Sequence, residues 1–374
     1  MKRKKILLMY ISTNSGHHQA ALALEKALRI LDPGVEILNV NSLNYTNQLI
    51  ERVINRTYMG IIKNSPEVWE YLYDNPKVFR NISKLRELIH RFNSGKLKML
   101  LDDFRPDAIV CTQAFPCGMV ADYKSSFGLD VPLLGALTDC APHSYWIFDS
   151  VNYYIVHSDT AKDKLVENGI PKERIRIFGI PIDPGFTNEK DVNEIINVIG
   201  IDKSIPVILI MGGGQGLGPI PEIVSSLNRI NRPIQMLIVA GTNERLFRWL
   251  EKRRRYFKMA SFVYGYVSNI DELMAVATLI ITKPGGLTIS EAMARNLPMI
   301  IIHPIPGQEA KNTEYLLKEG AAIKADSVKD VGVLTEALLN QPAKLEQMRL
   351  NSKRIARPNS ANEIAKLVLE CANS

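Results

Sequence analysis

The sequence predicts an α/β protein made of two successive open domains, each built on a parallel sheet. Short apolar runs alternate with amphipathic stretches along the chain, which is the pattern of parallel strands joined by helices. With 374 residues, the chain is long enough for two domains that each bury a core. A segment rich in proline, glycine and polar residues interrupts the series at 184–195, and we place the linker there.

The first series of predicted strands lies before this linker. Its apolar runs are KILLMYI (5–11), VEILNVN (35–41), DAIVCTQ (107–113), VPLLGALTD (131–139) and NYYIVHS (152–158). Helix-compatible stretches lie between them, so the connections suit parallel pairing. We therefore expect a first domain over residues 1–186.

The second series begins after the linker. Its runs are PVILIMGGG (206–214), QMLIVAG (235–241), SFVYGYV (261–267), TLIITKPGG (278–286) and LPMIIIHP (297–304). We expect a second domain over 187–358 and a last helix over 359–374, which can pack back on the first domain. Ligands of open α/β sheets bind at the carboxyl ends of the strands, so a cleft between the domains is the expected site.

Composition narrows the class of protein. Hydrophobic residues make up 46% and charged residues 23% of the chain, as in globular proteins, and no apolar run is long enough for a transmembrane helix. The basic start MKRKKILLMYIS resembles a signal peptide but has no small-residue cleavage site, so we interpret it as the first strand. Four cysteines without metal or redox spacing indicate reduced thiols in a cytoplasmic protein.

A basic and aromatic insertion over 45–100 follows the second predicted strand. It holds ten basic and five acidic residues with aromatic rings interleaved, in a chain whose net charge is +7. A basic surplus fits nucleic acid, anionic membranes or acidic small molecules. Rings among lipid headgroups and cations on anionic lipid favour a membrane surface here. The alternative is a solvated helical insertion whose aromatic residues belong to the core.

Two glycine-rich turns follow strands of the second series. In MGGGQGLGP (211–219), Gly213 and Gly214 can let a phosphate approach the backbone, although a purely structural turn is an alternative. The spacing matches neither a dinucleotide fingerprint nor a Walker A loop. This disfavours a nicotinamide-dependent oxidoreductase.

The second turn, TKPGGLTISEAMARNLP (282–298), is more specific. Its strand ends at Lys283, Gly285 and Gly286 make the turn, and Thr288 can cap the helix that follows. Glu291 shares a helix face with Thr288, so its carboxylate can point toward a ligand held at the turn. The alternative for Glu291 is an acid that faces solvent in the first turn.

A further pair of polar residues opens the helix after the last predicted strand. Gln308 and Glu309 in HPIPGQEAKNTEYLLKEGAA (303–322) place an amide beside a carboxylate. Such a pair can hold vicinal hydroxyl groups, as sugar recognition requires. They are also ordinary residues for the first turn of a helix.

The chain resembles the processive diacylglycerol glucosyltransferases, and more distantly the plant monogalactosyldiacylglycerol synthases, from the first strand to about residue 350. The stretches that carry the resemblance are NSGHHQAA, TDCAPHSYWI, GIPIDPGF, GYVSNIDELMAVATLIITKPGGLTISEAMARNLPMI and PGQEAKNTEYLLKEGAA. The second half is also similar to the peptidoglycan GlcNAc transferase that acts on undecaprenyl-linked substrate.

This resemblance implies a GT-B fold, in which two Rossmann-like domains face a central cleft. It also implies a UDP-sugar donor, inversion of the anomeric centre, and neither a cofactor nor an active-site metal. Among the donor-binding residues, the diphosphate would contact Gly285, Gly286 and Thr288, with Gly213, Gly214 and Lys283 nearby. Glu291 would hold the ribose, Gln308 and Glu309 the hexose, and GYVSNIDEL (265–273) the uracil.

The resemblance also assigns residues of the first half. His17 aligns with the loop histidine of the family and is the predicted catalytic base, whereas His18 is predicted to be a bystander. A neutral imidazole at pH 7 suits the removal of a proton from the acceptor hydroxyl. Asp139, His143 and Trp146 carry the T-D-x-x-x-H-x-x-W pattern of the acceptor side, and His143 is a second candidate base. Helix amino termini after Gly213 and Gly286 would stabilise the leaving diphosphate.

The predicted function is the transfer of a hexose, glucose rather than galactose, from UDP-sugar to diacylglycerol in a membrane glycolipid. The expected partners are UDP-sugar, diacylglycerol and an anionic membrane surface, without nucleic acid. The protein would lie in the cytoplasm, on the inner face of the cell membrane. The alternatives are a UDP-GlcNAc 2-epimerase, a transferase to another lipid, and a membrane-associated regulator that senses UDP-sugar.

Overall fold

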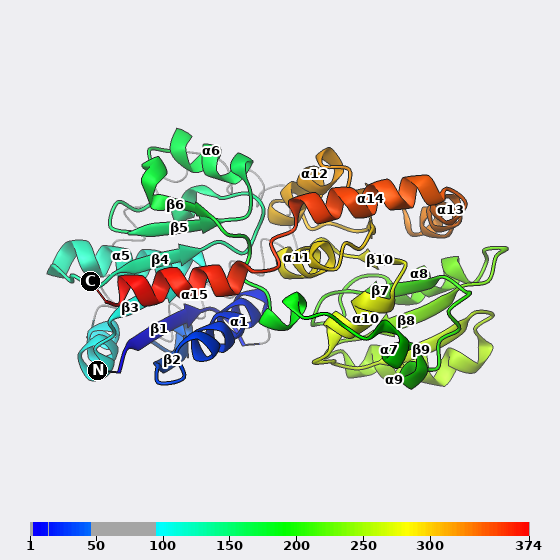
Figure 1. The fold of residues 1–374 in the computed structure, drawn as a ribbon, viewed down its shortest axis with the longest axis horizontal. Coiled ribbons are helices and arrows are strands. Elements are labelled where there is room, and N and C mark those ends of the chain that lie inside the picture. The colour runs from blue at the N-terminus through cyan, green and yellow to red at the C-terminus, as the bar shows by residue number, and fades with distance from the viewer. Residues whose placement is uncertain (1–2, 14, 46–94, 374) are drawn as a thin grey trace. The chain divides into compact units, whose positions relative to one another are not determined.

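A computed structural model describes residues 3–13, 15–45 and 95–373 (Figure 1). Most of the insertion predicted at 45–100 therefore lies outside the described residues. The chain divides into two compact units. One contains the described residues up to Pro184, together with Ile305–Gln308 and the residues from Asn359 onward. The other contains Gly185–Pro304 and Glu309–Pro358.

The first unit is built on a six-stranded sheet in the order β2-β1-β3-β4-β5-β6. All neighbouring strands are parallel, as predicted. The strands are β1 (Lys5–Tyr10), β2 (Glu36–Asn41), β3 (Ala108–Cys111), β4 (Leu133–Ala136), β5 (Tyr153–Val156) and β6 (Ile175–Ile177). The three-residue β6 was not among the predicted strands.

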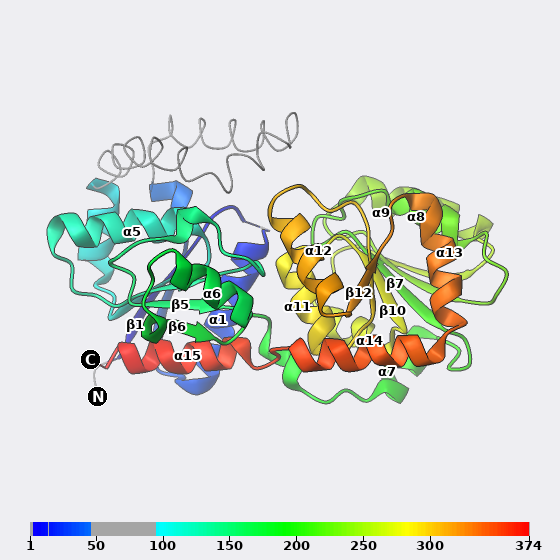
Figure 2. The ribbon, with the colours of Figure 1, turned by 90° about the horizontal axis from the view of Figure 1, so that it is seen from above.

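Helices cover both faces of this sheet. They are α1 (Gly16–Leu31), α5 (Ala114–Phe127), α6 (Asp159–Glu167), α15 (Ser360–Cys371) and a helix over residues 95–104. Figure 2 shows α15 and α1 on one face and α5 on the other. Alternation along β1 explains the two cores, since successive side chains of a strand point to opposite faces. Ile6 and Leu8 pack with α1 and α15, whereas Leu7 and Met9 pack with α5.

The last helix packs within the first unit, which answers a question that the sequence left open. Ile364 and Val368 of α15 share an apolar cluster with Leu24 of α1. The Ser360 hydroxyl also accepts a hydrogen bond of 3.3 Å from the backbone N–H of Ile182.

The second unit is also built on a parallel six-stranded sheet, in the order β12-β11-β10-β7-β8-β9. Its strands are β7 (Val207–Met211), β8 (Gln235–Val239), β9 (Ala260–Tyr264), β10 (Leu279–Thr282), β11 (Met299–Ile301) and β12 (Ala322–Lys324). Its helices are α7 (Val192–Ile199), α8 (Ile220–Leu227), α9 (Glu244–Arg253), α10 (Ile270–Val276), α11 (Gly286–Ala294), α12 (Gln308–Lys318), α13 (Val328–Leu339) and α14 (Pro342–Ile355). Every residue of β7, at the centre of this sheet, is buried.

Both sheets have a point where the direction of strand addition reverses. This switch point lies between β1 and β3 in the first sheet and between β7 and β10 in the second. Loops that leave adjacent strands in opposite directions open a crevice there, which is where open α/β sheets bind ligands. In the part of the chain that the structure describes, no helix is long and apolar enough to cross a membrane.

Candidate active site

His17 lies in the first turn of α1, at the switch point of the first sheet. The helix begins at Gly16, and the Ser15 side chain caps it by accepting the N–H of His18 at 3.2 Å. The Ser15 hydroxyl in turn lies 2.8 Å from the Ile11 carbonyl in the loop after β1. The cap therefore fixes where the helix starts, and with it the position of His17 at the carboxyl edge of the sheet.

The two neighbouring strands hold the imidazole of His17. Its Nδ1 lies 3.0 Å from the carbonyl oxygen of Thr112, directly after β3, and 2.8 Å from the Thr138 hydroxyl, just after β4. A carbonyl can only accept, so Nδ1 carries the proton and Nε2 keeps its lone pair. The arrangement leaves Nε2 as the nitrogen that can take a proton from a substrate.

Sequence reasoning did not single out either threonine. The Thr112 hydroxyl donates a hydrogen bond of 2.8 Å to the backbone carbonyl of His17, so the contact between β3 and α1 is reciprocal. Thr112 is fully buried, and Thr138 is 5% exposed. Thr138 lies in the TDCAPHSYW stretch, so the motif could have pointed to it. The only sequence feature that points to Thr112 is its position directly after a predicted strand.

The environment of His17 keeps its imidazole neutral. Burial lowers the pKa of His17 to about 4, and the Thr112 carbonyl opposes this shift. Burial also lowers the pKa of His143 to about 3, with further lowering by His17 and Lys164. Because a charge on His17 acts on His143, the structure brings these two predicted site residues into one electrostatic environment.

The other predicted residues of the acceptor side lie in the segment after β4. Asp139 is half-buried and adjoins Thr138. Trp146, at the end of a short 3-10 helix, is only 4% exposed and belongs to the apolar core. Its ring lies so near Gly135 that a Cβ there would be 3.2 Å away. Trp146 thus supports the loop by packing, and its predicted contact with an acceptor stays a prediction.

His18 differs from His17 although the two are adjacent. Its ring stacks on Tyr10 at the end of β1, with centroids 4.3 Å apart and an interplanar angle of 27°. Burial lowers the pKa of His18, and Glu25 opposes this shift. The stacking gives His18 a packing contact with the sheet, whereas the hydrogen bonds of His17 orient its ring.

The predicted donor residues gather at the switch point of the second sheet. Lys283 and Gly285 follow β10, and Gly213 and Gly214 follow the neighbouring β7. The Thr282 hydroxyl joins the two strand ends by donating a hydrogen bond of 2.8 Å to the Met211 carbonyl. Both glycine-rich turns therefore leave adjacent strands at the same edge of the sheet.

The structure corrects the expected cap of α11. This helix begins at Gly286 with Gly285 as its N-cap, so Thr288 lies inside the first turn and is 7% exposed. Among the described residues, no side chain caps this amino terminus. The glycine pair reaches helical geometry earlier than the sequence suggested. Such an end suits an anion.

A helix follows the 211–219 stretch, as predicted, but its amino terminus is seven residues from Gly213. The next helix, α8, begins only at Ile220, after a loop that folds back on itself through a hydrogen bond of 2.9 Å from the Leu217 N–H to the Gly212 carbonyl. Gly213 has a φ of +67°, which favours glycine. Gly213 therefore lies in a tight backbone turn, not at a helix terminus.

The glycines of these turns differ in the space around the position that a Cβ would occupy. A Cβ on Gly212 would lie 1.8 Å from the Leu217 carbonyl oxygen, and one on Gly216 would lie 2.0 Å from that of Ala240. Among the described residues, no atom lies within 4 Å of a Cβ built on Gly214 or Gly285, and neither has a positive φ. Close packing explains the first two glycines, whereas the last two leave open space for a ligand.

An ion pair joins α12 to the turn before α11. Lys283 Nζ lies 2.6 Å from Glu309 Oε1, and these side chains are only 16% and 13% exposed. The buried Asn312 amide donates a hydrogen bond of 3.0 Å to the Pro284 carbonyl and fixes the same two elements together. Two of the predicted donor residues, Lys283 and Glu309, are thus in direct contact. Gln308, the first residue of α12, directly precedes Glu309.

The remaining predicted donor-binding residues lie on α11 and around α10. Glu291 is a half-buried residue of α11. In the segment predicted to line the uracil, the Asp271 carboxylate pairs with Lys190 at 2.6 Å and with Arg295 at 3.5 Å. Asp271 therefore anchors α10 to the chain before α7.

Comparisons with known proteins identify the family. The model of the monogalactosyldiacylglycerol (MGDG) synthase family matches residues 17–182, and that of the glycosyltransferase family 28 C-terminal domain matches 207–368. The processive diacylglycerol β-glucosyltransferase of Bacillus thuringiensis (strain Al Hakam) is 33% identical over 373 residues, which cover 99% of this chain and 94% of the relative. That of Bacillus mycoides (strain KBAB4) is 34% identical over 372 residues, with the same coverage. The chain belongs to the processive diacylglycerol β-glucosyltransferase family.

Solved structures agree with the GT-B fold expected of this glucosyltransferase family. MurG of Acinetobacter baumannii has a TM-score of 0.62 at 13% identity and covers 98% of this chain and 99% of its own. UDP-GlcNAc 2-epimerase of Neisseria meningitidis has a TM-score of 0.60 at 13% identity and covers 98% and 100%. At such identities the likeness shows the fold alone, and the fold prediction is confirmed.

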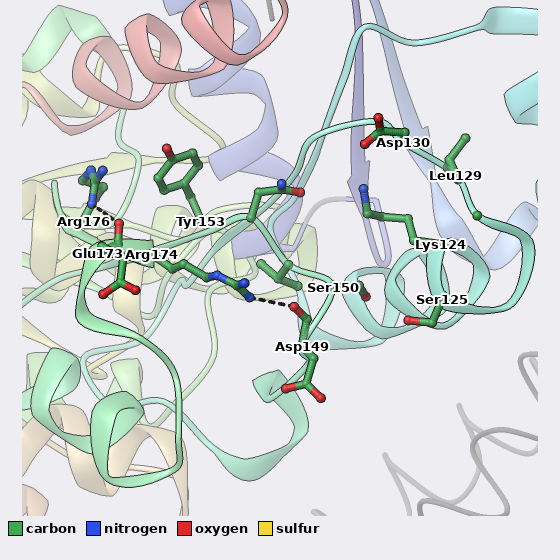
Figure 3. A pocket seen from close by; sticks show the side chains of 13 residues that line it. Lys124, Ser125, Leu129, Asp130, Asp149, Ser150, Tyr153, Glu173, Arg174 and Arg176 are labelled. Atoms are coloured by element: carbon green, nitrogen blue, oxygen red, sulfur yellow. Dashed lines mark hydrogen bonds between the residues drawn. The ribbon is translucent and has the colours of Figure 1, made fainter.

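A hollow of this glucosyltransferase-family chain lies at the opposite edge of the first sheet from His17 (Figure 3). It measures about 790 Å³ and lies between the end of α5 and the starts of β5 and β6. Its arginines bind backbone carbonyls, since Arg174 donates to Asp149 and Arg176 to Glu173, each at 2.7 Å. Open α/β sheets bind ligands at the carboxyl ends of their strands, which is where the predicted base His17 lies and where this hollow does not.

Proposed function

We propose that this chain transfers glucose from UDP-glucose to diacylglycerol, the activity that names its relatives. The observation that carries the proposal is the match along 99% of the chain to processive diacylglycerol β-glucosyltransferases. The alternative function, a UDP-GlcNAc 2-epimerase, is not supported by the similar epimerase structure, because that similarity extends to the fold alone. Glucose is favoured over galactose because the matched relatives are glucosyltransferases.

In the proposed reaction, the acceptor hydroxyl attacks the anomeric carbon of the sugar. A new C–O bond forms there as the bond to the UDP oxygen breaks, and attack from the opposite face inverts the anomeric centre. The hydroxyl proton passes to Nε2 of His17. Nδ1–H stays bonded to the Thr112 carbonyl and the Thr138 hydroxyl, which supports this assignment by orienting the ring. A pKa of about 4 keeps the base neutral before the reaction.

The departing UDP carries negative charge that must be stabilised. We place its diphosphate at the amino terminus of α11, where no side chain caps the helix and Gly285 leaves open space. Lys283 lies beside this turn, and its ion pair with Glu309 holds that carboxylate in place. The ion pair thereby orients the Glu309 carboxylate, and we assign this carboxylate and the neighbouring Gln308 to the hexose hydroxyls and Glu291 to the ribose.

We further propose that the protein works from the cytoplasm as a peripheral protein on the inner face of the cell membrane. Its acceptor is a lipid, and the sequence of the 45–100 segment combines cations with aromatic rings. The proposed product is therefore a membrane glycolipid.

The test of this function is a transfer assay with labelled UDP-glucose and vesicles that contain diacylglycerol. We expect a labelled glucosyl lipid in the organic phase, and much less product from UDP-galactose. Vesicles without diacylglycerol serve as the control for hydrolysis of the donor. Release of UDP without a labelled lipid, or isomerisation of UDP-GlcNAc in the absence of an acceptor, would contradict the proposal.

A further inference from the structure

A short segment of the second unit holds much of the net positive charge of the chain. It runs from α9 through a 3-10 helix, η5 (Arg254–Tyr256), to Lys258. The segment has two acidic residues, Glu244 and Glu251, and seven basic ones, a net charge of +5 in a chain whose net charge is +7. All seven cations are exposed: Arg245, Arg248, Lys252, Arg253, Arg254, Arg255 and Lys258. We call this segment the α9–η5 basic surface.

The fold does not use these cations for its core. The side of α9 that packs inward is apolar, with Leu246 and Leu250 in the core of the second unit. Two acids cannot neutralise seven cations, and the pairs that form are exposed. Arg248 lies 2.8 Å from Glu244, with both side chains more than three-quarters exposed. Such pairs add little stability, so the surplus charge needs another explanation.

Aromatic rings are interleaved with the cations. The Arg253 guanidinium lies over the Trp249 ring at 4.7 Å from its centroid, and that of Arg255 lies over Tyr256 at 4.8 Å. Tyr256 is 71% exposed. Together with Lys252, these side chains border a hollow of about 780 Å³ beside α8. The rings thus stand in the same exposed surface as the charges.

We infer that the α9–η5 basic surface binds an anionic phospholipid bilayer. Anionic headgroups complement its charge, and an exposed tyrosine and a tryptophan suit the boundary between headgroups and acyl chains. The inference rests on the proposed function, because the acceptor lipid makes the membrane the partner. It adds a membrane contact on the second unit to the membrane contact that the sequence of the 45–100 segment suggests for the first unit.

The test compares two triple variants of the full chain. Lys252→Gln, Arg253→Gln and Arg255→Gln remove three charges from the surface, and glutamine preserves helix propensity. Lys324→Gln, Lys329→Gln and Lys344→Gln remove three exposed charges elsewhere on the second unit. Binding is measured by co-sedimentation with phosphatidylcholine vesicles, with and without phosphatidylglycerol. We expect the first variant to lose affinity for the anionic vesicles by roughly 100-fold, and the control to bind like the wild type.

Equal binding by the wild type and the first variant would overturn the inference. So would a single-stranded oligonucleotide that displaces the wild type from anionic vesicles, because it would favour nucleic acid as the partner. Should the triple variant not fold, the single variant Lys252→Glu at an exposed position should still bind more weakly, by tenfold or more.

A second assay separates this inference from the proposed function. With diacylglycerol dissolved in neutral detergent, no anionic surface is needed, so the first variant should transfer glucose as fast as the wild type. Loss of transfer in detergent by the first variant alone would place these residues in catalysis and overturn the inference. A wild type that transfers no glucose under any condition, yet binds anionic vesicles better than the variant, would refute the function and leave the membrane surface standing.

Discussion

At the scale of single residues, the central feature is the pair of threonines that hold His17. A backbone carbonyl and a hydroxyl do here what a carboxylate often does for a catalytic histidine, which is to fix the tautomer and the ring plane. Neither group carries a full charge, so neither raises the pKa of the imidazole as a carboxylate would. The imidazole therefore stays neutral at pH 7, and its low pKa makes it a weak base.

Replacing Thr138 should slow catalysis without weakening donor binding. Thr138→Val removes the hydroxyl 2.8 Å from His17 Nδ1 and keeps the shape of the side chain. We expect kcat to fall about tenfold, the size of one hydrogen bond, with KM for UDP-glucose nearly unchanged. Thr138→Ser retains the hydroxyl and should recover most of the rate. Steady-state kinetics of both variants check this, and a kcat of Thr138→Val equal to that of the wild type would remove Thr138 as a positioning residue.

The histidines should make the protein less stable in acid. Their pKa values of about 4 for His17 and about 3 for His143 lie below the 6.5 of an unfolded chain. As the pH falls from 7 to 5, the unfolded state binds protons that the native state does not, so stability falls. The loss is on the order of 1–2 kcal/mol for each histidine.

Urea unfolding at pH 7 and pH 5 measures this loss, by comparing the wild type with His17→Gln and His143→Gln. Each variant should lose less stability between the two pH values than the wild type does. An equal loss in all three proteins would show that these imidazoles do not titrate with lowered pKa values.

At the scale of elements, the turns after β7 and β10 are both rich in glycine, but glycine is needed in the two turns for different reasons. The loop after β7 needs Gly212 and Gly216 because backbone atoms approach them closely. The turn before α11 needs no glycine at 285 for its own packing. A ligand that fills the open space would explain that residue.

A matched pair of variants tests this difference. Gly285→Ala places a methyl group in open space at an allowed φ of −66°, so the protein should fold with an unchanged melting temperature. Its affinity for UDP should fall roughly tenfold or more, because the methyl group meets the diphosphate. Gly212→Ala should instead unfold the second unit, since its Cβ would overlap the Leu217 carbonyl. Thermal melting and titration calorimetry give both readouts, and normal UDP affinity in Gly285→Ala would place the donor elsewhere.

The strands show how much of the fold could be predicted from apolar runs in the sequence. Each of the ten predicted runs overlaps an observed strand, and the central strands, which are buried on both faces, are the most continuous apolar runs. The two strands not predicted, β6 and β12, have three residues each and lie at sheet edges, where a run is too short to stand out.

For the candidate site, the sequence could predict which residues follow which strand. The KPGG turn was singled out by its place between a predicted strand and a predicted helix, whereas His17 of the GHH loop was assigned through the resemblance to a known family. The contacts of His17 with Thr112 and Thr138 were not predicted, since they join residues about a hundred positions apart. The start of α11 at Gly286 depends on a backbone geometry that a glycine pair leaves open in the sequence.

At the scale of the whole molecule, the chain repeats one plan twice. Two parallel sheets each carry a switch point, and the predicted base lies at one while the predicted donor residues lie at the other. The predicted base lies in a unit that also contains α15, so segments far apart in the sequence build its core together. A segment of the other unit carries a net charge of +5, in a chain whose net charge is +7.

The measurement that tests the account most directly is glucose transfer to diacylglycerol by the wild type, His17→Ala and His18→Ala in parallel. The account predicts a labelled glucosyl lipid from the wild type and a rate from His17→Ala lower by about 10²–10⁴-fold, the range of a lost general base. His18→Ala, which loses only a stacking contact with Tyr10, should stay within a few-fold of the wild type. Transfer by His17→Ala at a near-normal rate would contradict the account, because Nε2 of His17 would then not be the base.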